Sequence, residues 1–345
     1  MATIKDVAKL AKVSISTVSL ALNGSERVSA DTLKRIQDAA NSVGYSPNPL
    51  AQGLKAGRSR MIGMVLADLA NPFYSQMLKQ VENLLIDHQY LVVVASSRGN
   101  AKRERAILET LASQRVSGII LSSHITSPED VAYLKSLKIP MVLVDHKVDG
   151  FAADFVGCDN RMASAMLTER LIREGHTRIA HLAGVEGLWT AEERNQGFRA
   201  TMAAFGLEVD ESLILHGDYD GDIGYKQAMR MLVRPDKPTA VVAANNVMAL
   251  GALQAMRDLG IKCPEEVSLT AIDDAPWSKV IEPKMTMVVQ DVNEIAEMAT
   301  RFLIDRTTPA GADIPPREHI LVPQFVLGQS IASPVKAASF QDSAP

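Results

Sequence analysis

Polar and aromatic side chains stand directly after short apolar runs between residues 60 and 330, and these runs read as buried strands. The side chains concerned are Asn71, Phe73, Tyr74, Asp145, Asn245 and Asp273. In parallel sheets, ligands bind beyond the carboxyl ends of the strands. Carboxylate and amide groups there can hydrogen-bond a polar small molecule, and aromatic rings can cover its apolar faces. The chemistry predicted is reversible binding.

Catalytic signatures are missing from the same segments. Asp273 and Asp274 are adjacent at a predicted strand end and project in different directions, so they are poor candidates for two cooperating carboxylates. The sequence contains no nucleophile elbow, P-loop, HExxH or dinucleotide fingerprint. Cys158 and Cys263 belong to no metal-ligand cluster and no disulfide framework. We therefore expect no enzyme activity, no cofactor and no metal.

The elements that position the polar residues alternate between strand and helix. Predicted strands cover Met61–Leu66, Tyr90–Ala95, Gly118–Leu121, Pro140–Val144, Asp154–Val156, Arg178–Leu182, Leu213–His216, Thr239–Ala244 and Ser268–Ile272. Predicted helices include Tyr74–His88, Lys102–Gln114, Ala163–Glu174, Asn195–Phe205 and Val292–Asp305, and Glu318–Val322 and Phe325–Leu327 read as closing strands. Such alternation predicts doubly wound parallel sheets, and because it restarts midway we expect two lobes.

The first 22 residues follow a different pattern. Ile4, Val7, Ala8 and Ala11 have helical spacing, and Thr3 with Asp6 forms a capping pair before them. Ser14 is a predicted N-cap for a second helix, Ile15–Leu22, that buries Val18, Ala21 and Leu22. Ser16 and Leu20 then face the other way, where Leu20 could contact a thymine methyl group.

A third helix is predicted after Ser29, with apolar positions at Leu33, Ile36, Ala40 and Val43 and an end at Gly44. The runs IKDVAKLAKVSISTVSLALNG and VSADTLKRIQDAANSVGYSPN together resemble the DNA-binding headpiece of the lactose-repressor (LacI/GalR) family of bacterial transcription regulators. The resemblance extends to about Ser330. It implies an all-α helix-turn-helix headpiece followed by an α/β bilobed core like that of periplasmic binding proteins, with two doubly wound parallel sheets.

The resemblance assigns DNA contacts to the headpiece. Base-reading positions of the recognition helix match Ile15, Ser16 and Leu20, and phosphate-holding positions match Ser14, Thr17, Ser19, Asn23, Ser29 and Thr32. Leu20 departs from the members that carry Arg or His there. Without a bidentate donor to guanine, readout must rest on serine hydrogen bonds and apolar methyl contacts, so no operator sequence can be transferred.

Residues 48–59 are predicted to be a hinge. Asn48 can cap a helix and Pro49 suits its first position, but about nine residues containing Gly53 are too few to hold a helix alone in water. The resemblance implies that this helix folds on DNA and inserts Leu54 into the minor groove, with Ala51 one turn earlier. The alternative is a plain flexible linker.

For the core, the resemblance adds two ligand-binding residues, Arg194 and Tyr219, to the side chains at the strand ends. With them, carboxylate, amide and guanidinium groups and aromatic rings converge on one cleft, and a sugar or related polyol fits best. Asn71 could instead belong to a simple turn with Pro72, and large aromatic side chains could fill the core. Asn246 stands where many members have Asp, which makes the effector's identity harder to transfer.

Charge is unevenly distributed along the 345 residues. Residues 1–60 hold nine Lys and Arg against four acidic residues, a net charge of +5, whereas the remainder holds 27 against 36, a net charge of −9. A basic head on an acidic body suits attraction to DNA phosphates through the head alone. No apolar signal core and no run of 18 apolar residues occurs, so we expect a cytoplasmic protein with no membrane partner.

The predicted domains are a headpiece (1–47), a hinge (48–59), a bilobed effector-binding and dimerisation domain (60–332) and a disordered tail (333–345). The first lobe takes about 60–160 and 290–322, and the second about 161–289 and 323–332. The expected partners are pseudo-palindromic operator DNA, a sugar-like effector and a second copy of the chain. The expected function is that of a repressor released by its effector. Control by a purine-like corepressor and a DNA-independent sugar-binding module remain as alternatives.

Overall fold

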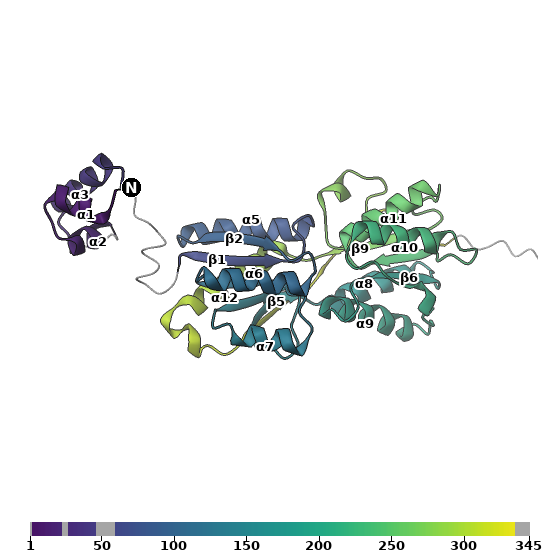
Figure 1. The fold of residues 1–345 in the computed structure, drawn as a ribbon. Coiled ribbons are helices and arrows are strands. Elements are labelled where there is room, and N and C mark those ends of the chain that lie inside the picture. Colours follow the sequence, from purple (N-terminus) through teal and green to yellow (C-terminus); the bar gives the residue numbers. More distant parts are fainter. Residues whose placement is uncertain (1, 23–26, 46–58, 335–345) are drawn as a thin grey trace, which may run out of the picture. The chain divides into compact units, whose positions relative to one another are not determined.

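The computed structural model describes residues 2–22, 27–45 and 59–334 of the chain. Its contacts divide the chain into two compact units, Met1–Arg60 with Gln114–Val116, and the remainder. The first unit holds the helices of the headpiece and the second holds the bilobed core (Figure 1).

The headpiece contains three helices, α1 (Ile4–Ala11), α2 (Ile15–Leu22) and α3 (Ala30–Ser42). The predicted capping of α1 is confirmed, because the Asp6 carboxylate accepts hydrogen bonds from the Thr3 backbone N–H and hydroxyl, both at 2.8 Å. The helices bury one small core, composed of Val7, Ala8, Ala11, Val18, Ala21, Ile36, Ala39 and Ala40. The helical periodicity read from the sequence therefore identified the buried faces.

The first lobe contains a six-stranded sheet in the order β11-β5-β4-β3-β1-β2. Its strands are β1 (Met61–Leu66), β2 (Leu91–Ser96), β3 (Gly118–Leu121), β4 (Met141–Val144), β5 (Asp154–Cys158) and β11 (Glu318–Leu321). Its helices are α5 (Pro72–Asp87), α6 (Ala101–Ser113), α7 (Pro128–Ser136) and α12 (Val292–Thr307). Helices α5 and α12 pack on one face of the sheet, where Met77 and Leu303 are fully buried. Helix α6 approaches β1 so closely that a Cβ on Gly63 would lie 2.7 Å from Leu111.

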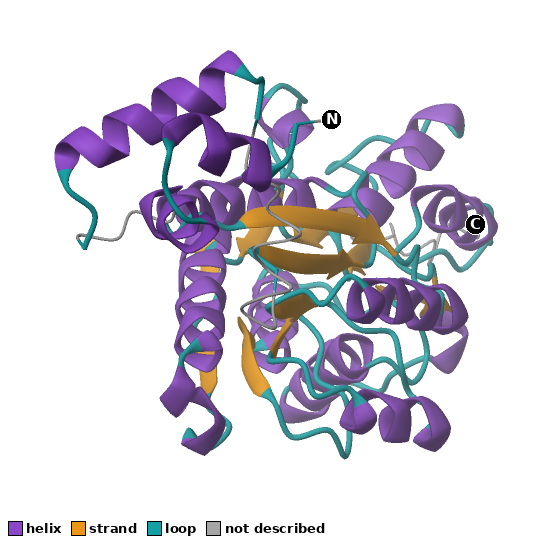
Figure 2. Cartoon of the chain, turned by 60° about the vertical axis from the view of Figure 1, so that its left-hand side comes forward, coloured by secondary structure: helices purple, strands orange, loops and turns teal. Residues whose placement is uncertain are grey.

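The second lobe contains another six-stranded sheet, in the order β12-β10-β9-β8-β6-β7. Its strands are β6 (Ile179–Ala183), β7 (Ile214–His216), β8 (Ala240–Ala243), β9 (Ser268–Ile272), β10 (Thr286–Val289) and β12 (Gln324–Val326). Helices α8 (Asn160–Arg173) and α9 (Trp189–Ala204) pack on one face, and α10 (Gly221–Leu232) and α11 (Asn246–Asp258) pack on the other. The helix layers enclose the strands (Figure 2). Each lobe thus has the α/β layer arrangement that strand-helix alternation predicts.

The chain passes between the two sheets three times. It leaves the first sheet after β5, returns to the first lobe between β10 and α12, and leaves β11 for β12 in the second sheet. These three crossings are the covalent connections between the lobes in the described core, and each lobe has a separate hydrophobic core.

Four details differ from the sequence prediction. Strand β10, which lies between β12 and β9, is not among the predicted strands. Strand β2 was predicted to be buried, but it is an edge strand on which Leu91 is 63% exposed. Strand β12 pairs antiparallel with β10, so the second sheet is not wholly parallel. Helix α9 begins at Trp189 rather than Asn195, because its first turns are poor in apolar residues and give little periodic signal.

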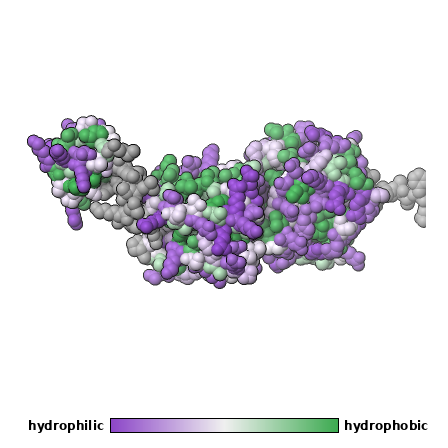
Figure 3. Space-filling view, in the orientation of Figure 1, coloured by the Kyte–Doolittle hydropathy of each residue, from purple (hydrophilic) through white to green (hydrophobic). Residues whose placement is uncertain are grey.

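The exposed residues of β2 belong to a wider apolar surface. Ile86 at the end of α5 and Leu91 and Val94 on β2 are all exposed. Figure 3 shows hydrophobic side chains gathered over α5 and β2 in the first lobe. An edge strand with apolar side chains is a surface that proteins usually cover.

A buried group of ion pairs joins β5 to α12 and to the residue before β11. Asp154 has no exposed surface and accepts hydrogen bonds from Arg306 at 2.7 and 3.0 Å and from the Arg317 side chain at 2.8 Å. Although burial opposes ionisation, these two arginines hold the pKa of Asp154 below its usual value. Asp305 pairs with the same Arg317 at 2.7 Å, but its side chain is 42% exposed.

We predict that Asp154→Ala lowers the free energy of unfolding by about 3–5 kcal/mol, because it leaves two cations without their buried partner. The matched control is Asp305→Ala, which removes a solvent-exposed partner of Arg317 and should cost at most about 1 kcal/mol. Urea unfolding followed by circular dichroism measures both. Equal effects of the two substitutions would contradict the assignment of Asp154 as the structural anchor.

Candidate functional site

Helix α2 presents an exposed face in the headpiece. Ile15 and Leu20 are 46% and 43% exposed, and Ser16 is exposed beside them. Ser14 caps the helix as predicted, because its Oγ accepts the Thr17 backbone N–H at 3.1 Å. The same Oγ lies 2.7 Å from the hydroxyls of Ser16 and Thr17, so three hydroxyl groups gather at this helix end.

The remaining headpiece candidates have separate positions. Ser29 caps α3 by accepting the Thr32 backbone N–H at 3.4 Å, and its hydroxyl donates to Thr32 Oγ1 at 3.0 Å. Ser19 is half-buried on α2. Asn23 and the hinge residues Ala51 and Leu54 lie outside the described residues.

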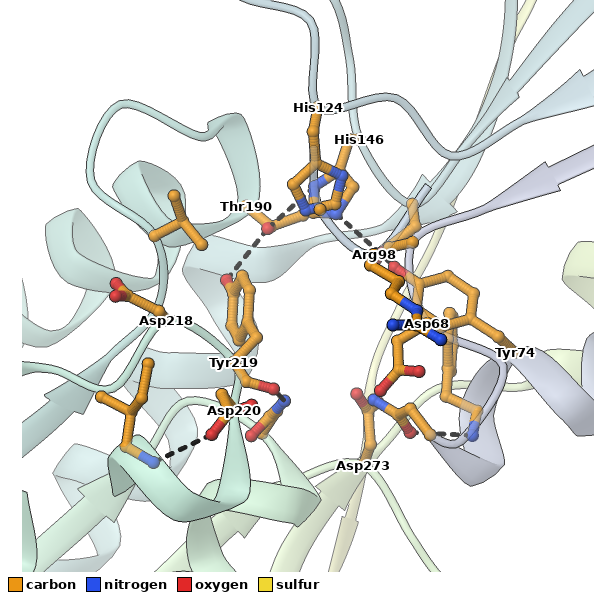
Figure 4. A pocket seen from close by; sticks show the side chains of 18 of the residues that line it. Asp68, Tyr74, Arg98, His124, His146, Thr190, Asp218, Tyr219, Asp220 and Asp273 are labelled. Carbon is orange, nitrogen blue, oxygen red and sulfur yellow. Dashed lines mark hydrogen bonds and ion pairs between the residues drawn. The ribbon is translucent and has the colours of Figure 1, made fainter. Parts of the chain in front are cut away.

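The core contains a cavity of about 530 Å³ that is lined from both lobes (Figure 4). The eight residues that the sequence singled out all line it: Asn71, Phe73, Tyr74, Asp145, Arg194, Tyr219, Asn245 and Asp273. Three come from the loop after β1 and the start of α5. Asp145 and Asp273 follow β4 and β9 directly, and Asn245 lies two residues after the end of β8. The carboxyl ends of the strands therefore do converge on one space.

On the side of the first lobe, Asp145 is the centre of a hydrogen-bond group. Its Oδ2 accepts the Tyr74 hydroxyl at 2.7 Å and lies 3.1 Å from His146 Nε2. The Tyr74 hydroxyl also lies 3.1 Å from Ser122 Oγ. Among the described residues, none bonds to the second carboxylate oxygen of Asp145, so this oxygen can accept a hydrogen bond from a ligand.

The network continues into the second lobe. His146 Nδ1 lies 3.0 Å from Thr190 Oγ1, and that oxygen lies 2.9 Å from the Tyr219 hydroxyl. The chain from Asp145 to Tyr219 thus crosses from one lobe to the other. Gly184 makes room for it, because a Cβ there would lie 2.2 Å from the Tyr219 ring.

Arg194 lies on α9 and is almost fully buried. Its Nε donates to Asn160 at 2.7 Å, another nitrogen donates to the Ala244 carbonyl, and the guanidinium lies 5.6 Å from the centre of the Tyr219 ring. Burial opposes its charge, but Tyr219 and the carboxylate of Asp273 more than offset this and raise the pKa of Arg194.

Asp273 has a matching environment at the end of β9. It accepts a hydrogen bond from Gln290 Nε2 at 2.8 Å. Burial raises the pKa of Asp273 to about 6, against the opposing effects of Arg194 and Gln290. Asp273 and Asp145 both have left-handed backbones, with φ of 73° and 66°. Such strain at two strand ends is typical of residues held in place for a ligand.

Several cavity residues were missed by the sequence prediction. They are Ala67, Asp68, Arg98, Gly99, His124, His146, Val185, Thr190, Asp218, Asp220 and Ile223. Some of them could have been found from the sequence, because ligands bind beyond the carboxyl ends of parallel strands. Arg98 comes after β2, His124 comes after β3, and His146 follows Asp145 at the end of β4. Thr190 lies inside α9, where no local signal distinguishes it from other polar helix residues.

The two missed histidines stand together as neutral rings. Their ring centres are 5.0 Å apart in an edge-to-face arrangement. Burial lowers the pKa of His124 to about 3 and also lowers that of His146. The Nδ1 of His124 is buried and has no hydrogen-bond partner among the described residues.

Glu104 on α6 positions His124. It is fully buried and accepts hydrogen bonds from Ser123 Oγ at 2.5 Å and from the His124 backbone N–H at 2.8 Å. Burial raises the pKa of Glu104 to about 7 in spite of these bonds.

The described part of the chain has no group of three His, Cys, Asp or Glu arranged to hold a metal ion.

Two family models match the chain. Residues 3–48 match the bacterial regulatory proteins of the lacI family, and residues 59–303 match the periplasmic binding proteins and sugar binding domain of the LacI family. The chain belongs to the LacI family. It is therefore a DNA-binding transcriptional regulator with an effector-binding domain.

Similar proteins agree with this membership along nearly the whole chain. The HTH-type transcriptional repressor PurR of Aliivibrio salmonicida (strain LFI1238) is 32% identical over 89% of this LacI-family chain and 92% of its own length. The lac repressor dimer bound to operator and the anti-inducer ONPF is 26% identical, with a TM-score of 0.84 over 96% of this chain and 99% of that one. The complex of the transcriptional regulator CelR with cellobiose is 30% identical, with a TM-score of 0.72 over 96% and 100%. Within the described residues no helix is long and apolar enough to cross a membrane.

We predict that Glu104→Gln changes how the stability of this LacI-family protein depends on pH. The folded pKa of Glu104 is raised from the model-compound value of 4.5 to about 7, so ionising the buried carboxyl opposes folding. Its stabilising contribution is present below pH 4.5 and is lost as pH rises towards 7. Relative to Glu104→Gln, the natural protein should lose about 2–3 kcal/mol of unfolding free energy between pH 5 and pH 8.

Urea unfolding at pH 5, 6, 7 and 8 measures this difference. Glu109→Gln on the exposed side of the same helix is the matched control and should leave the pH dependence unchanged. Parallel pH profiles for the natural protein and Glu104→Gln would show that Glu104 does not titrate in this range.

Proposed function

We propose that the protein is a homodimeric, sequence-specific repressor whose operator affinity is controlled by a small sugar-like effector in the cavity between the lobes. One observation carries the proposal. The hydrogen-bond chain from Asp145 through His146 and Thr190 to Tyr219 joins the two lobes around the cavity. A ligand that bonds to both ends of this chain must favour one arrangement of the lobes over another.

The side chains suit adjacent hydroxyl groups on a ring. Asp145 and Asp273 each have one carboxylate oxygen that no described residue bonds to, and the two residues come from opposite lobes. Phe73, Tyr219 and the histidine pair supply ring faces or edges for the C–H side of a sugar. The CelR structure, which contains cellobiose, supports a carbohydrate in this class of cavity.

DNA binding is proposed to use the exposed face of α2, with Ile15, Ser16 and Leu20 at base edges. Ser14, Thr17, Ser19, Asn23, Ser29 and Thr32 are proposed to hold phosphates, and Ala51 and Leu54 to enter the minor groove. The gathering of hydroxyl groups at the start of α2 supports the phosphate contacts, because helix N-termini attract anions. The similar lac repressor is described as a dimer bound to operator.

A second copy of the chain is proposed to cover the apolar surface of Ile86, Leu91 and Val94. These three side chains are exposed at an edge of the first sheet, where pairing would bury them. Two copies of the headpiece would then reach two half-sites of a pseudo-palindromic operator. We expect the coupling between effector and operator to be about 1–3 kcal/mol.

We further infer that the protein is not an enzyme and that it works in the cytoplasm, where its DNA partner lies. The cavity contains carboxylates, neutral histidines and arginines, but no serine or cysteine is among the residues that line it. The proposed lobes and hinge keep the boundaries predicted above.

Release of DNA by the effector is the favoured direction of control, and corepression is the alternative. An operator-binding assay distinguishes the two.

The test is a panel of sugars, polyols and nucleobases applied to the full-length protein, with thermal unfolding as the readout. A true effector at 100 times its dissociation constant adds about 2.7 kcal/mol of stability and raises the midpoint by a few degrees. Fluorescence anisotropy with a selected operator duplex then shows whether a hit releases DNA or promotes binding. Failure to find any salt-dependent duplex binding would refute the proposed function and favour a DNA-independent sugar-binding module.

We predict that Gly184→Ala weakens binding of such a hit at least about tenfold, because the new methyl group displaces the Tyr219 ring. Gly206→Ala is the control for a glycine substitution in the same lobe, since no atom lies near its Cβ position. Its φ of 71° will cost some stability but leaves the cavity intact. Equal effector affinity in the two variants would remove Tyr219 from the proposed site.

We predict that Leu20→Ala changes the preferred base at one position of each half-site without abolishing binding, because Leu20 would lose its contact with a thymine methyl group. Leu10→Ala is the matched control, since Leu10 is also exposed in the headpiece but lies on α1. Selection from a randomised half-site library measures the preference. An unchanged preference would mean that Leu20 reads no base.

A further inference from the structure

The charged groups that line the cavity are mostly carboxylates. The five acidic residues are Asp68, Asp145, Asp218, Asp220 and Asp273, whereas Arg98 and Arg194 are the cationic ones among the described lining residues. His124 and His146 add no charge near neutral pH, because burial lowers the pKa of both rings. The lining therefore has three more negative than positive charges.

Arg194 is partly committed to partners within the protein. Its guanidinium already donates to Asn160 and to the Ala244 carbonyl, and it is buried against the Tyr219 ring. Its charge is also balanced by Asp273 and Asp145, which help to raise its pKa. Removing that balance to bind a phosphate would leave a buried carboxylate unpaired.

The helix N-termini at the cavity are capped by side chains of the protein. Asn71 accepts the Phe73 N–H of α5 at 3.0 Å, Asp220 accepts the Ile223 N–H of α10 at 2.9 Å, and Asn245 accepts the Met248 N–H of α11 at 2.9 Å. All three capping residues line the cavity. Each cap occupies one backbone N–H, so a phosphate at these N-termini would compete with a side chain of the protein for that donor.

Arg98 remains as the other cation. It lies after β2 and is exposed, as are Asp68, Asp218 and Asp220, so water and salt screen these four charges alike and the carboxylates still outnumber Arg98. Asp68, which is also exposed, lines the same cavity (Figure 4). Asp218 and Asp220 line the cavity from the second lobe, so acidic residues are present on both sides of it.

We propose that this cavity has a negative potential and selects an uncharged or cationic sugar-like ligand over a phosphorylated or carboxylated one. The inference rests on the proposed function of the cavity as the effector site and names the charge class of that effector. The raised pKa of Asp273 agrees with it, because after burial the neighbouring Asp145 and Asp274 also disfavour a further negative charge at this position.

The potential can be measured without knowing the ligand. Val185 is a half-buried cavity residue in the loop after β6, and Val185→Cys places a thiol there. The full-length variant is reacted separately with two methanethiosulfonate reagents, the cationic 2-(trimethylammonium)ethyl reagent and the anionic 2-sulfonatoethyl reagent. The rate with the cationic reagent is divided by the rate with the anionic one, and this ratio is then divided by the same ratio for free 2-mercaptoethanol. The natural protein is the background control, because Cys158 is buried and burial raises the pKa of Cys158 and Cys263 to about 12.

We expect a normalised ratio of at least about ten at low ionic strength, because a negative cleft concentrates cations and repels anions. The ratio should fall with added salt and in the double variant Asp218→Asn, Asp220→Asn, in which Asn retains the ability to cap α10. Asp210→Asn and Asp236→Asn, outside the cavity, form the matched control and should leave the ratio unchanged. A normalised ratio of one or less overturns the proposal.

Matched ligands supply the second readout. Glucose, galactose and ribose are compared by titration calorimetry with their phosphate esters, their sugar acids and, for the hexoses, their 2-amino forms. Where a pair binds, we expect the neutral or amino sugar to bind at least about tenfold more tightly than the anionic one at low salt. Tighter binding of a phosphate ester or sugar acid overturns the charge selection and leaves the proposed function intact. If no carbohydrate binds but the normalised labelling ratio is above ten, the proposal of a sugar effector is refuted, whereas the negative potential of the cavity is supported.

Discussion

Three charged side chains, Asp145, Asp273 and Arg194, are buried at the cavity, and a buried charge is costly unless it has partners. Each of them is accordingly bound to neighbours: Asp145 by Tyr74, Asp273 by Gln290, and Arg194 by Asn160. These partners come from helices and loops of both lobes. The need to satisfy the three charges therefore constrains which side chains these helices and loops place at the cavity.

The lobes are connected across the cavity by neutral hydrogen bonds rather than by ion pairs. His146 bonds to Thr190, and Asn246 Nδ2 donates to Asn71 Oδ1 at 3.3 Å. Neutral bonds of this kind each contribute about 1 kcal/mol, which is weak enough for a ligand to shift the balance between lobe arrangements. The two sheets have separate cores, so a change in their relative position leaves each core intact.

Local sequence signals predicted much of this structure because they depend on near neighbours. The capping groups of Thr3, Ser14 and Ser29 form as expected, since each involves a backbone N–H or a side chain three residues away. Strands β3 and β9 have the predicted bounds, because buried strands read as continuous apolar runs. The start of α9 was placed six residues too late, because Trp189–Arg194 is held by contacts with other elements rather than by its own apolar pattern.

By itself, the sequence determined the alternation of strands and helices apart from strand β10, the capped helices of the headpiece and the strand ends that would carry polar side chains. Tertiary structure decided which of these ends meet, that Thr190 and His146 complete the hydrogen-bond chain, and that β2 is an edge strand. It also decided that His124 and His146 are neutral and that Arg194 is already paired. The physical reason is that periodicity and capping act over a few residues, whereas burial, pKa and pairing depend on side chains brought together from distant parts of the chain.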